Sequence, residues 1–135
     1  MNWEDGQVKT KTGSCAGNAT ISLSPGAGRK WLVIYGWIKI VCDATVANRN
    51  TILQITTSGG TDLTYVATSP NVTASNSYTW RLIPISGYVT VTIQPGIFTN
   101  NVMVVNGTDK LYITTAAGVA GDAVTCSITV IELPA

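Results

Sequence analysis

The chain has 135 residues, of which 45% are hydrophobic and 11% are charged, and it contains no histidine. This length fits one domain with a packed core. The net charge of +1 argues against a nucleic-acid partner bound by broad attraction to phosphates, and against a polybasic membrane anchor. We expect no transmembrane segment and no secretory signal, since no run of apolar residues has the required length or setting.

Residues 1–17 are polar and show little periodicity, so we expect an N-terminal arm, followed by a single β-sandwich domain over residues 18–135. Trp3 is the one large aromatic residue of this arm, and a Trp is costly to leave in water. We therefore expect the arm to reach across a subunit or capsid boundary and to contribute Trp3 as an anchor.

The remainder of the chain consists of short runs in which apolar and polar residues alternate, each closed by Gly, Pro or Asn. This pattern predicts strands, in chain order, over residues 19–24, 30–42, 49–57, 62–66, 78–82, 89–94, 102–105, 110–114 and 124–133. No segment predicts a helix. About eight strands with turns at this spacing are typical of an all-β protein, an antiparallel β-sandwich of jelly-roll type.

The segment 30–42 is the longest apolar run. One parity is aliphatic, and the other carries Trp31, Tyr35 and Trp37, while Gly36 in the middle indicates a bulge or a bend. One face of a sandwich needs only one apolar parity. The aromatic parity must therefore be covered by a neighbouring subunit, by the chain's own loops or arm, or by a sugar. Trp and Tyr are enriched at interfaces, which favours the subunit.

The inward parity of these strands predicts the core. It comprises Ile21, Leu23, Leu32, Ile34, Ile38, Ile40, Leu53, Ile55, Val89, Val91, Ile93, Leu111, Ile113, Val124, Cys126 and Ile128. On the last strand the apolar pattern changes parity after Val130, which indicates a bulge there or burial of both faces.

Catalytic chemistry is hard to build from this composition. Without histidine there is no Ser–His or Cys–His pair, and the three cysteines form no short-spaced motif for a metal or a disulfide framework. Asp43, Asp62, Asp109 and Asp122 all adjoin turns, and we interpret them as turn caps and not as paired catalytic carboxylates. We expect no enzyme, no metal and no cofactor.

The segment PGAGRKWLVIYGWIKIVCDATVANRNTILQI (residues 25–55) carries a proline–glycine entry, a long apolar strand and Asn48-Arg49, which opens the next strand. Gly121-Asp122 opens the last strand, which ends in Val-Ile-Glu-Leu at residues 130–133. Over residues 21–133 the chain resembles the small jelly-roll decoration, or cement, proteins of tailed-bacteriophage capsids. The resemblance implies a virion structural protein on the capsid surface, made in the host cytoplasm, that forms a homotrimer and binds the major capsid protein. It implies no catalytic residues.

The expected subunit or capsid interface comprises Trp3, Trp31, Tyr35, Trp37 and Arg49. We expect the Arg49 guanidinium to be structural, holding a loop or a neighbouring subunit through backbone carbonyls or a carboxylate. The alternative function is a carbohydrate- or receptor-binding β-sandwich module of a phage tail or fibre, and a glycan-active enzyme ranks third.

Overall fold

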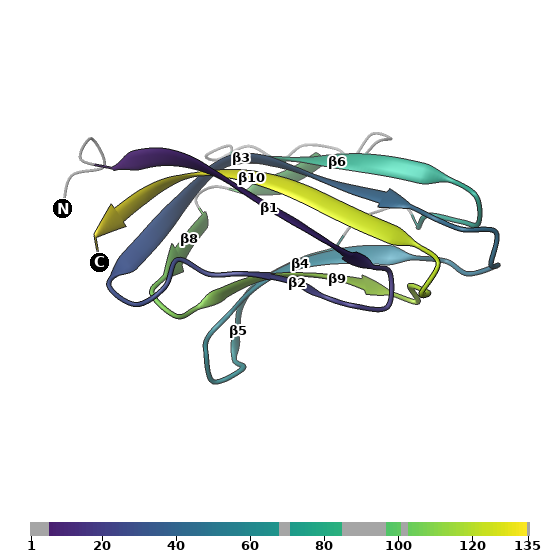
Figure 1. The fold of residues 1–135 in the computed structure, drawn as a ribbon, viewed down its shortest axis with the longest axis horizontal. Coiled ribbons are helices and arrows are strands. Elements are labelled where there is room, and N and C mark those ends of the chain that lie inside the picture. Colours follow the sequence, from purple (N-terminus) through teal and green to yellow (C-terminus); the bar gives the residue numbers. More distant parts are fainter. Residues whose placement is uncertain (1–5, 68–70, 85–96, 101–102, 135) are drawn as a thin grey trace.

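The computed structural model describes residues 6–67, 71–84, 97–100 and 103–134, and every regular element in these ranges is a strand (Figure 1). The strands are β1 (Gln7–Ala16), β2 (Ile21–Leu23), β3 (Arg29–Val41), β4 (Asn50–Thr56), β5 (Asp62–Ala67), β6 (Ser77–Pro84), β7 (Ile97–Asn100), β8 (Met103–Asn106), β9 (Lys110–Ala116) and β10 (Ala123–Pro134). The described ranges contain no helix that is long and apolar enough to cross a membrane.

The strands form two layers, as Figure 1 shows. The first sheet has the order β1-β10-β3-β6-β7, with β8 also paired to β3, and the second has the order β2-β9-β4-β5. With β7 and β8 set aside as an insertion between β6 and β9, each sheet takes its four strands alternately from the two halves of the chain. This is the jelly-roll arrangement. The predicted all-β, antiparallel sandwich is confirmed, and the parallel pair β6–β7 is the exception.

Strand β1 corrects the prediction of an N-terminal arm over residues 1–17. All ten of its residues pair with β10. Its sequence hides the strand because Lys9 and Lys11 occupy inward positions, opposite the buried Val130 and Ile128. Residues 1–5, including Trp3, lie outside the described residues, as do the expected strand over 89–94 and the core residues predicted there.

A bulge in β3 changes the face that its side chains occupy. Thr129 of β10 pairs with Tyr35, whereas the next residue, Val130, pairs with Val33, so Ile34 is the extra residue. From the sequence we predicted an irregularity near Val130 of β10 and another at Gly36 of β3. The register places the bulge at Ile34 of β3, which lies opposite the step from Thr129 to Val130. Strand β10 itself keeps its parity, and its end is buried on both faces.

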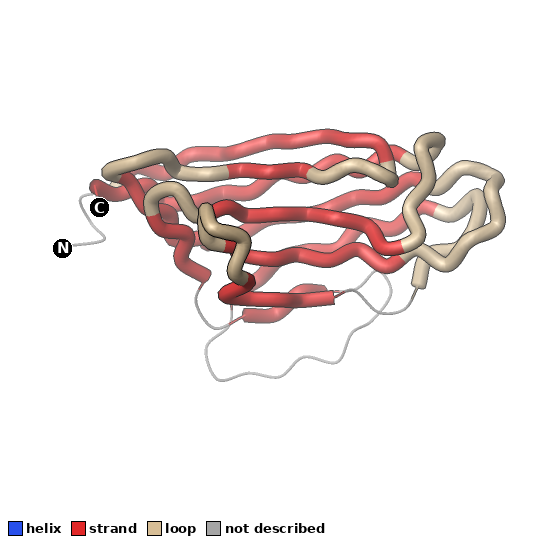
Figure 2. Tube along the Cα trace, turned by 90° about the horizontal axis from the view of Figure 1, so that it is seen from below, coloured by secondary structure: helices blue, strands red, loops and turns tan. Residues whose placement is uncertain are grey.

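The bulge overturns part of the predicted core. Before it Trp31 and Val33 point inward, and after it Ile38 and Ile40 do, whereas Leu32 and Ile34 are only half-buried. The predicted core residues that are buried are Ile21, Ile38, Ile40, Leu53, Ile55, Leu111, Ile113, Val124, Cys126 and Ile128. Leu23 is half-buried against them. The loops between the strands gather at the two ends of the sandwich (Figure 2).

Candidate functional site

The outer face, meaning the solvent side of the sheet β1-β10-β3-β6, carries two accessible aromatic residues, Tyr35 and Trp37. Beyond the bulge Ile38 and Ile40 point inward, so Tyr35, Trp37 and Lys39 point outward. On the neighbouring strand β6, Arg81 lies opposite Trp37, and Thr79 lies opposite Lys39. Paired residues of neighbouring strands share a face, which places all five side chains together.

These five residues line a shallow groove of about 250 Å³, which we call the outer groove. Tyr35 is 44% exposed there. The groove offers two aromatic rings, two cationic groups and two hydroxyls, those of Tyr35 and Thr79. Groups of these kinds are the ones that ligand sites commonly use.

A second hollow of about 490 Å³ lies on the other side of Trp37. Its polar lining comes from β1 and β10, which place Thr12, Ser14, Thr125 and Ser127 on the same outer face. Trp37 lines both hollows. A ligand longer than one ring can therefore contact the aromatic groove and the hydroxyl-lined hollow together.

The other part of the outer face is apolar. Val8 pairs with Ile131, Ile131 with Leu32, and Leu32 with Val104, so these four residues form a row across β1, β10, β3 and β8, which we call the apolar row. Val8 is 68% exposed and the other three are half-buried. An aliphatic row on the solvent side of a sandwich is a surface suited to contact with protein.

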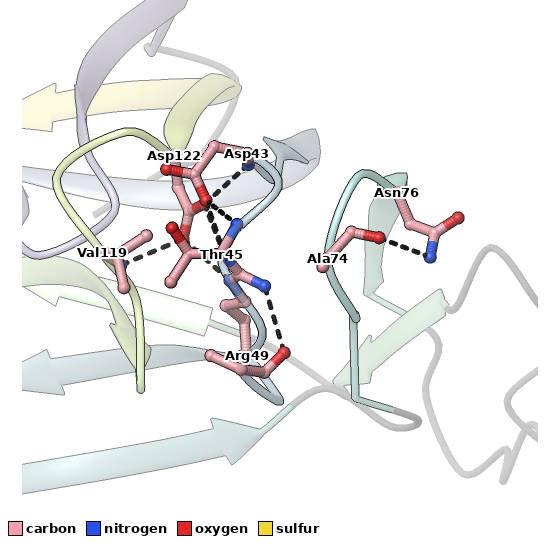
Figure 3. Close-up of polar contacts among 8 residues, drawn as sticks. Asp43, Thr45, Arg49, Ala74, Asn76, Val119 and Asp122 are labelled. Atoms are coloured by element: carbon pink, nitrogen blue, oxygen red, sulfur yellow. Dashed lines mark hydrogen bonds and ion pairs between the residues drawn. The ribbon is translucent and has the colours of Figure 1, made fainter.

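Arg49 directly precedes β4, and its side chain is fully buried. Figure 3 shows its polar contacts with Asp43 and Asp122. Its Nε donates to Oδ2 of Asp122, and its Nη2 donates to Oδ1, each at 3.0 Å. Nη2 also donates to Oδ1 of Asp43 at 3.1 Å, and Nη1 donates to the Ala47 carbonyl at 3.0 Å. The prediction that Arg49 holds a loop through a carboxylate and a carbonyl is confirmed.

Asp122 joins the β9–β10 loop to the β3–β4 loop. Besides Arg49, it accepts hydrogen bonds from the backbone amides of Asp43 and Val119, each at 3.0 Å. Burial by itself would raise the pKa of Asp122, but the hydrogen bonds from Arg49 and the two amides outweigh it and lower the pKa. The neighbouring Gly121 has no room for a side chain, because a Cβ would overlap the Asp43 carboxylate. The two sequence motifs, Asn48-Arg49 and Gly121-Asp122, therefore meet in one cluster. We call the cluster of Asp43, Arg49 and Asp122 the loop anchor.

Glu132 forms a second buried centre toward the start of β1. Its Oε1 accepts a hydrogen bond at 3.0 Å from Nε1 of Trp31, and its Oε2 accepts from Lys9 and, at 3.4 Å, from Arg29. The hydrogen bonds from Lys9 and then Trp31 lower the pKa of Glu132. Lys11 lies over the Trp31 ring, 5.6 Å from its centroid. Lys9 and Lys11 therefore point inward because Lys9 forms an ion pair with Glu132 and Lys11 packs over the Trp31 ring.

The structure separates the residues that the sequence grouped as an interface. Tyr35 and Trp37 lie together on the outer face. Trp31 is 2% exposed and Arg49 is 0% exposed, and each is bonded inside the chain, so assigning these two side chains to an interface was wrong. Sequence reasoning missed Arg81 and Lys39 as site residues. The sequence shows that each of the two alternates with apolar residues on its own strand, but it does not show that β3 and β6 pair and bring them to one groove.

The described residues contain no group of three or more histidine, cysteine, aspartate or glutamate side chains that is placed to hold a metal ion. All three cysteines are free, and Cys42 and Cys126 are buried.

Comparison with known proteins gives a limited likeness. No protein-family model matches the chain, and no curated protein matches it. Three solved structures from infectious bursal disease virus are similar to it. That of the Gx strain is 17% identical, with a TM-score of 0.40, over 93% of this chain and 31% of that one. That of the T13 viral particle is 14% identical, with a TM-score of 0.39, over 93% and 34%. That of the VP2 subviral particle is 18% identical, with a TM-score of 0.36, over 95% and 33%. This chain spans about a third of the length of each.

Proposed function

We propose that the chain is a virion structural protein: a decoration or cement protein that binds the outside of a bacteriophage capsid as a homotrimer. Its place is the capsid surface, after synthesis in the host cytoplasm, and its partners are two further copies of itself and the major capsid protein. The proposal joins the sequence resemblance to the jelly-roll topology. A fold by itself does not determine a function, so the proposal needs a surface that contacts protein.

The apolar row is the observation that carries the proposal. It crosses four strands on a face that a free sandwich would keep polar, and it includes the exposed Val8. The composition points the same way, since a surface with few charges repels other copies weakly. Burying the apolar row against another chain removes this aliphatic surface from water, which favours association.

The test is the mass of the protein in solution, measured by light scattering during size-exclusion chromatography. We expect a species of three times the 14.2 kDa chain mass. Val8→Lys places a charge in the apolar row and should shift this species to the monomer. Val46→Lys is the matched control, because Val46 is 92% exposed in the β3–β4 loop and away from the row.

Binding to the capsid is measured by sedimentation with heads purified from a mutant of the encoding phage that lacks this gene. We expect the wild-type chain and Val46→Lys to sediment with the heads, and Val8→Lys to remain in the supernatant. A wild-type chain that stays monomeric and does not bind heads would contradict the proposal.

A second candidate function is favoured by one observation, the outer groove. Its exposed Tyr35 and its cationic and hydroxyl groups are typical of a carbohydrate- or receptor-binding module, such as those of phage tails and fibres. Titration with a set of oligosaccharides tests this function, and a protein that binds none of them lacks it.

A further inference from the structure

We propose that the outer groove binds an acidic carbohydrate, an oligosaccharide in which at least one pyranose ring carries a carboxylate. The carboxylate lies between Lys39 and Arg81, and the sugar ring packs on Trp37 or Tyr35. This inference rests on the second proposed function and names the chemical class of its ligand.

The charges of the outer face select an anion. Lys39 and Arg81 are diagonal neighbours on β3 and β6, at a separation of roughly 7–8 Å between strand positions. The ion pairs found among the described residues involve Lys9, Arg29 and Arg49, and they leave Lys39 and Arg81 without a carboxylate partner. A ligand carboxylate between the two cations would supply that partner and receive charge-assisted hydrogen bonds.

The carboxylates that the structure shows in ion pairs are committed elsewhere. Asp43 and Asp122 bind Arg49 at one end of the sandwich, and Glu132 binds Lys9 on the inner side of the sheet. The outer-face positions of the described parts of β1, β3, β6 and β10 carry no aspartate or glutamate. The described outer face is therefore positive, although the whole chain has a net charge of only +1.

The aromatic rings distinguish a sugar from a simple anion. Trp and Tyr present large, rigid apolar surfaces, and the C–H face of a pyranose ring packs against such a surface. The volume of the groove, about 250 Å³, suits a single ring. The hydroxyls of Thr12, Ser14, Thr125 and Ser127 in the adjoining hollow suit the hydroxyls of the next sugar.

A single-stranded nucleic acid also combines an anion with flat rings, but it fits this face less well. Such ligands need a groove of cations that follows a backbone with one charge per nucleotide. The described outer face offers two cations beside a neutral Thr/Ser hollow. Two fixed cations match one or two isolated carboxylates.

The experiment is calorimetric titration with four probes. Two are acidic, 3′-sialyllactose and trigalacturonic acid, and two are neutral, lactose and maltotriose. We expect the acidic probes to bind with an affinity that falls as salt is added, and the neutral probes to bind at least tenfold more weakly. We expect Lys39→Ala and Arg81→Ala each to weaken acidic binding roughly tenfold, and Trp37→Ala to weaken it at least as much.

The control variant is Lys110→Ala. Lys110 lies beside Tyr112 on the second sheet, with its Nζ 5.8 Å from the ring centroid, so it provides the same pair of residue types away from the groove. We expect it to bind the acidic probes as the wild type does. Circular dichroism and the unfolding midpoint confirm that each variant is folded.

Three outcomes would overturn the inference. Equal binding of neutral and acidic probes, unchanged in Lys39→Ala and Arg81→Ala, would refute the acidic class while leaving carbohydrate binding intact. Binding of none of the probes would refute carbohydrate binding as well. Loss of self-association in Trp37→Ala, with no probe bound by the wild type, would identify the groove as a subunit contact.

Discussion

Replacement of Asp122 by asparagine tests the loop anchor most sharply. Each carboxylate oxygen of Asp122 accepts two hydrogen bonds: Oδ1 from the Asp43 amide and Arg49 Nη2, and Oδ2 from Arg49 Nε and the Val119 amide. Asparagine has the same shape but turns one oxygen into an NH₂ donor. Whichever oxygen is replaced, two donors then face a donor. The buried Arg49 loses its fully buried ionic partner and keeps only the partly exposed carboxylate of Asp43.

The expected loss is large because both side chains are fully buried. Removing one partner of a buried ion pair costs about 3–5 kcal/mol, and the loss of two hydrogen bonds to a charged group is of similar size. With a urea slope near 2 kcal/mol/M, typical of a small domain, the unfolding midpoint should fall by about 2 M. The assay is equilibrium urea unfolding followed by far-UV circular dichroism.

Asp109→Asn is the matched control. Asp109 lies in the β8–β9 turn, where its backbone amide donates to the Asn106 carbonyl, and asparagine keeps that bond. We expect a change within about 0.5 kcal/mol. A second variant, Arg49→Met, should destabilise the protein as well, and the double variant should lose less than the sum. A loss below about 1 kcal/mol for Asp122→Asn in a normally folded protein would refute the reasoning.

The two buried carboxylates, Asp122 and Glu132, predict how the stability of the protein responds to acid. The pKa values of Asp122 and Glu132 lie below their ordinary values of 3.8 and 4.5. A carboxyl with a lowered pKa adds stability that is complete above its ordinary pKa and is lost as the pH falls through its folded pKa. The urea midpoint of the wild type should therefore fall steadily below about pH 4. Asp122→Asn should show a weaker fall, and an equal fall would contradict this assignment.

Two further predictions concern packing and the thiols. Ile128→Ala should lower the free energy of unfolding in urea by about 2–5 kcal/mol, because Ile128 is fully buried. Ile34→Ala should cost less than half as much, because Ile34 lies at the bulge and is half-buried. Equal losses would place Ile34 in the core. Burial raises the pKa of the Cys126 thiol to about 11, so only about one thiol in a thousand is ionised at pH 8. Cys126 should react with Ellman's reagent only in denaturant, and rapid reaction of the folded chain at three thiols would contradict this.

The sequence by itself determined the class of the fold and the inward parity of its regular strands. Leu53 and Ile55 flank Gln54, Leu111 and Ile113 flank Tyr112, and all four aliphatic residues are buried, as their period of two predicts. The alternation suffices because successive side chains of a strand point to opposite faces, so a one-sided core leaves a period of two in the sequence.

Only the tertiary structure determines which side chains are buried where a contact with a residue distant in the sequence overrides the alternation. Lys9 points inward, and Trp31 is buried, because Glu132 lies between them on β10, 101 residues from Trp31 along the chain. Arg49 is buried because Asp122 meets it from 73 residues away. The bulge at Ile34 belongs to the register between β3 and β10. Pairings of this kind leave no local period in the sequence, so only the folded arrangement places Trp31 inside and leaves Tyr35 and Trp37 on the outer face.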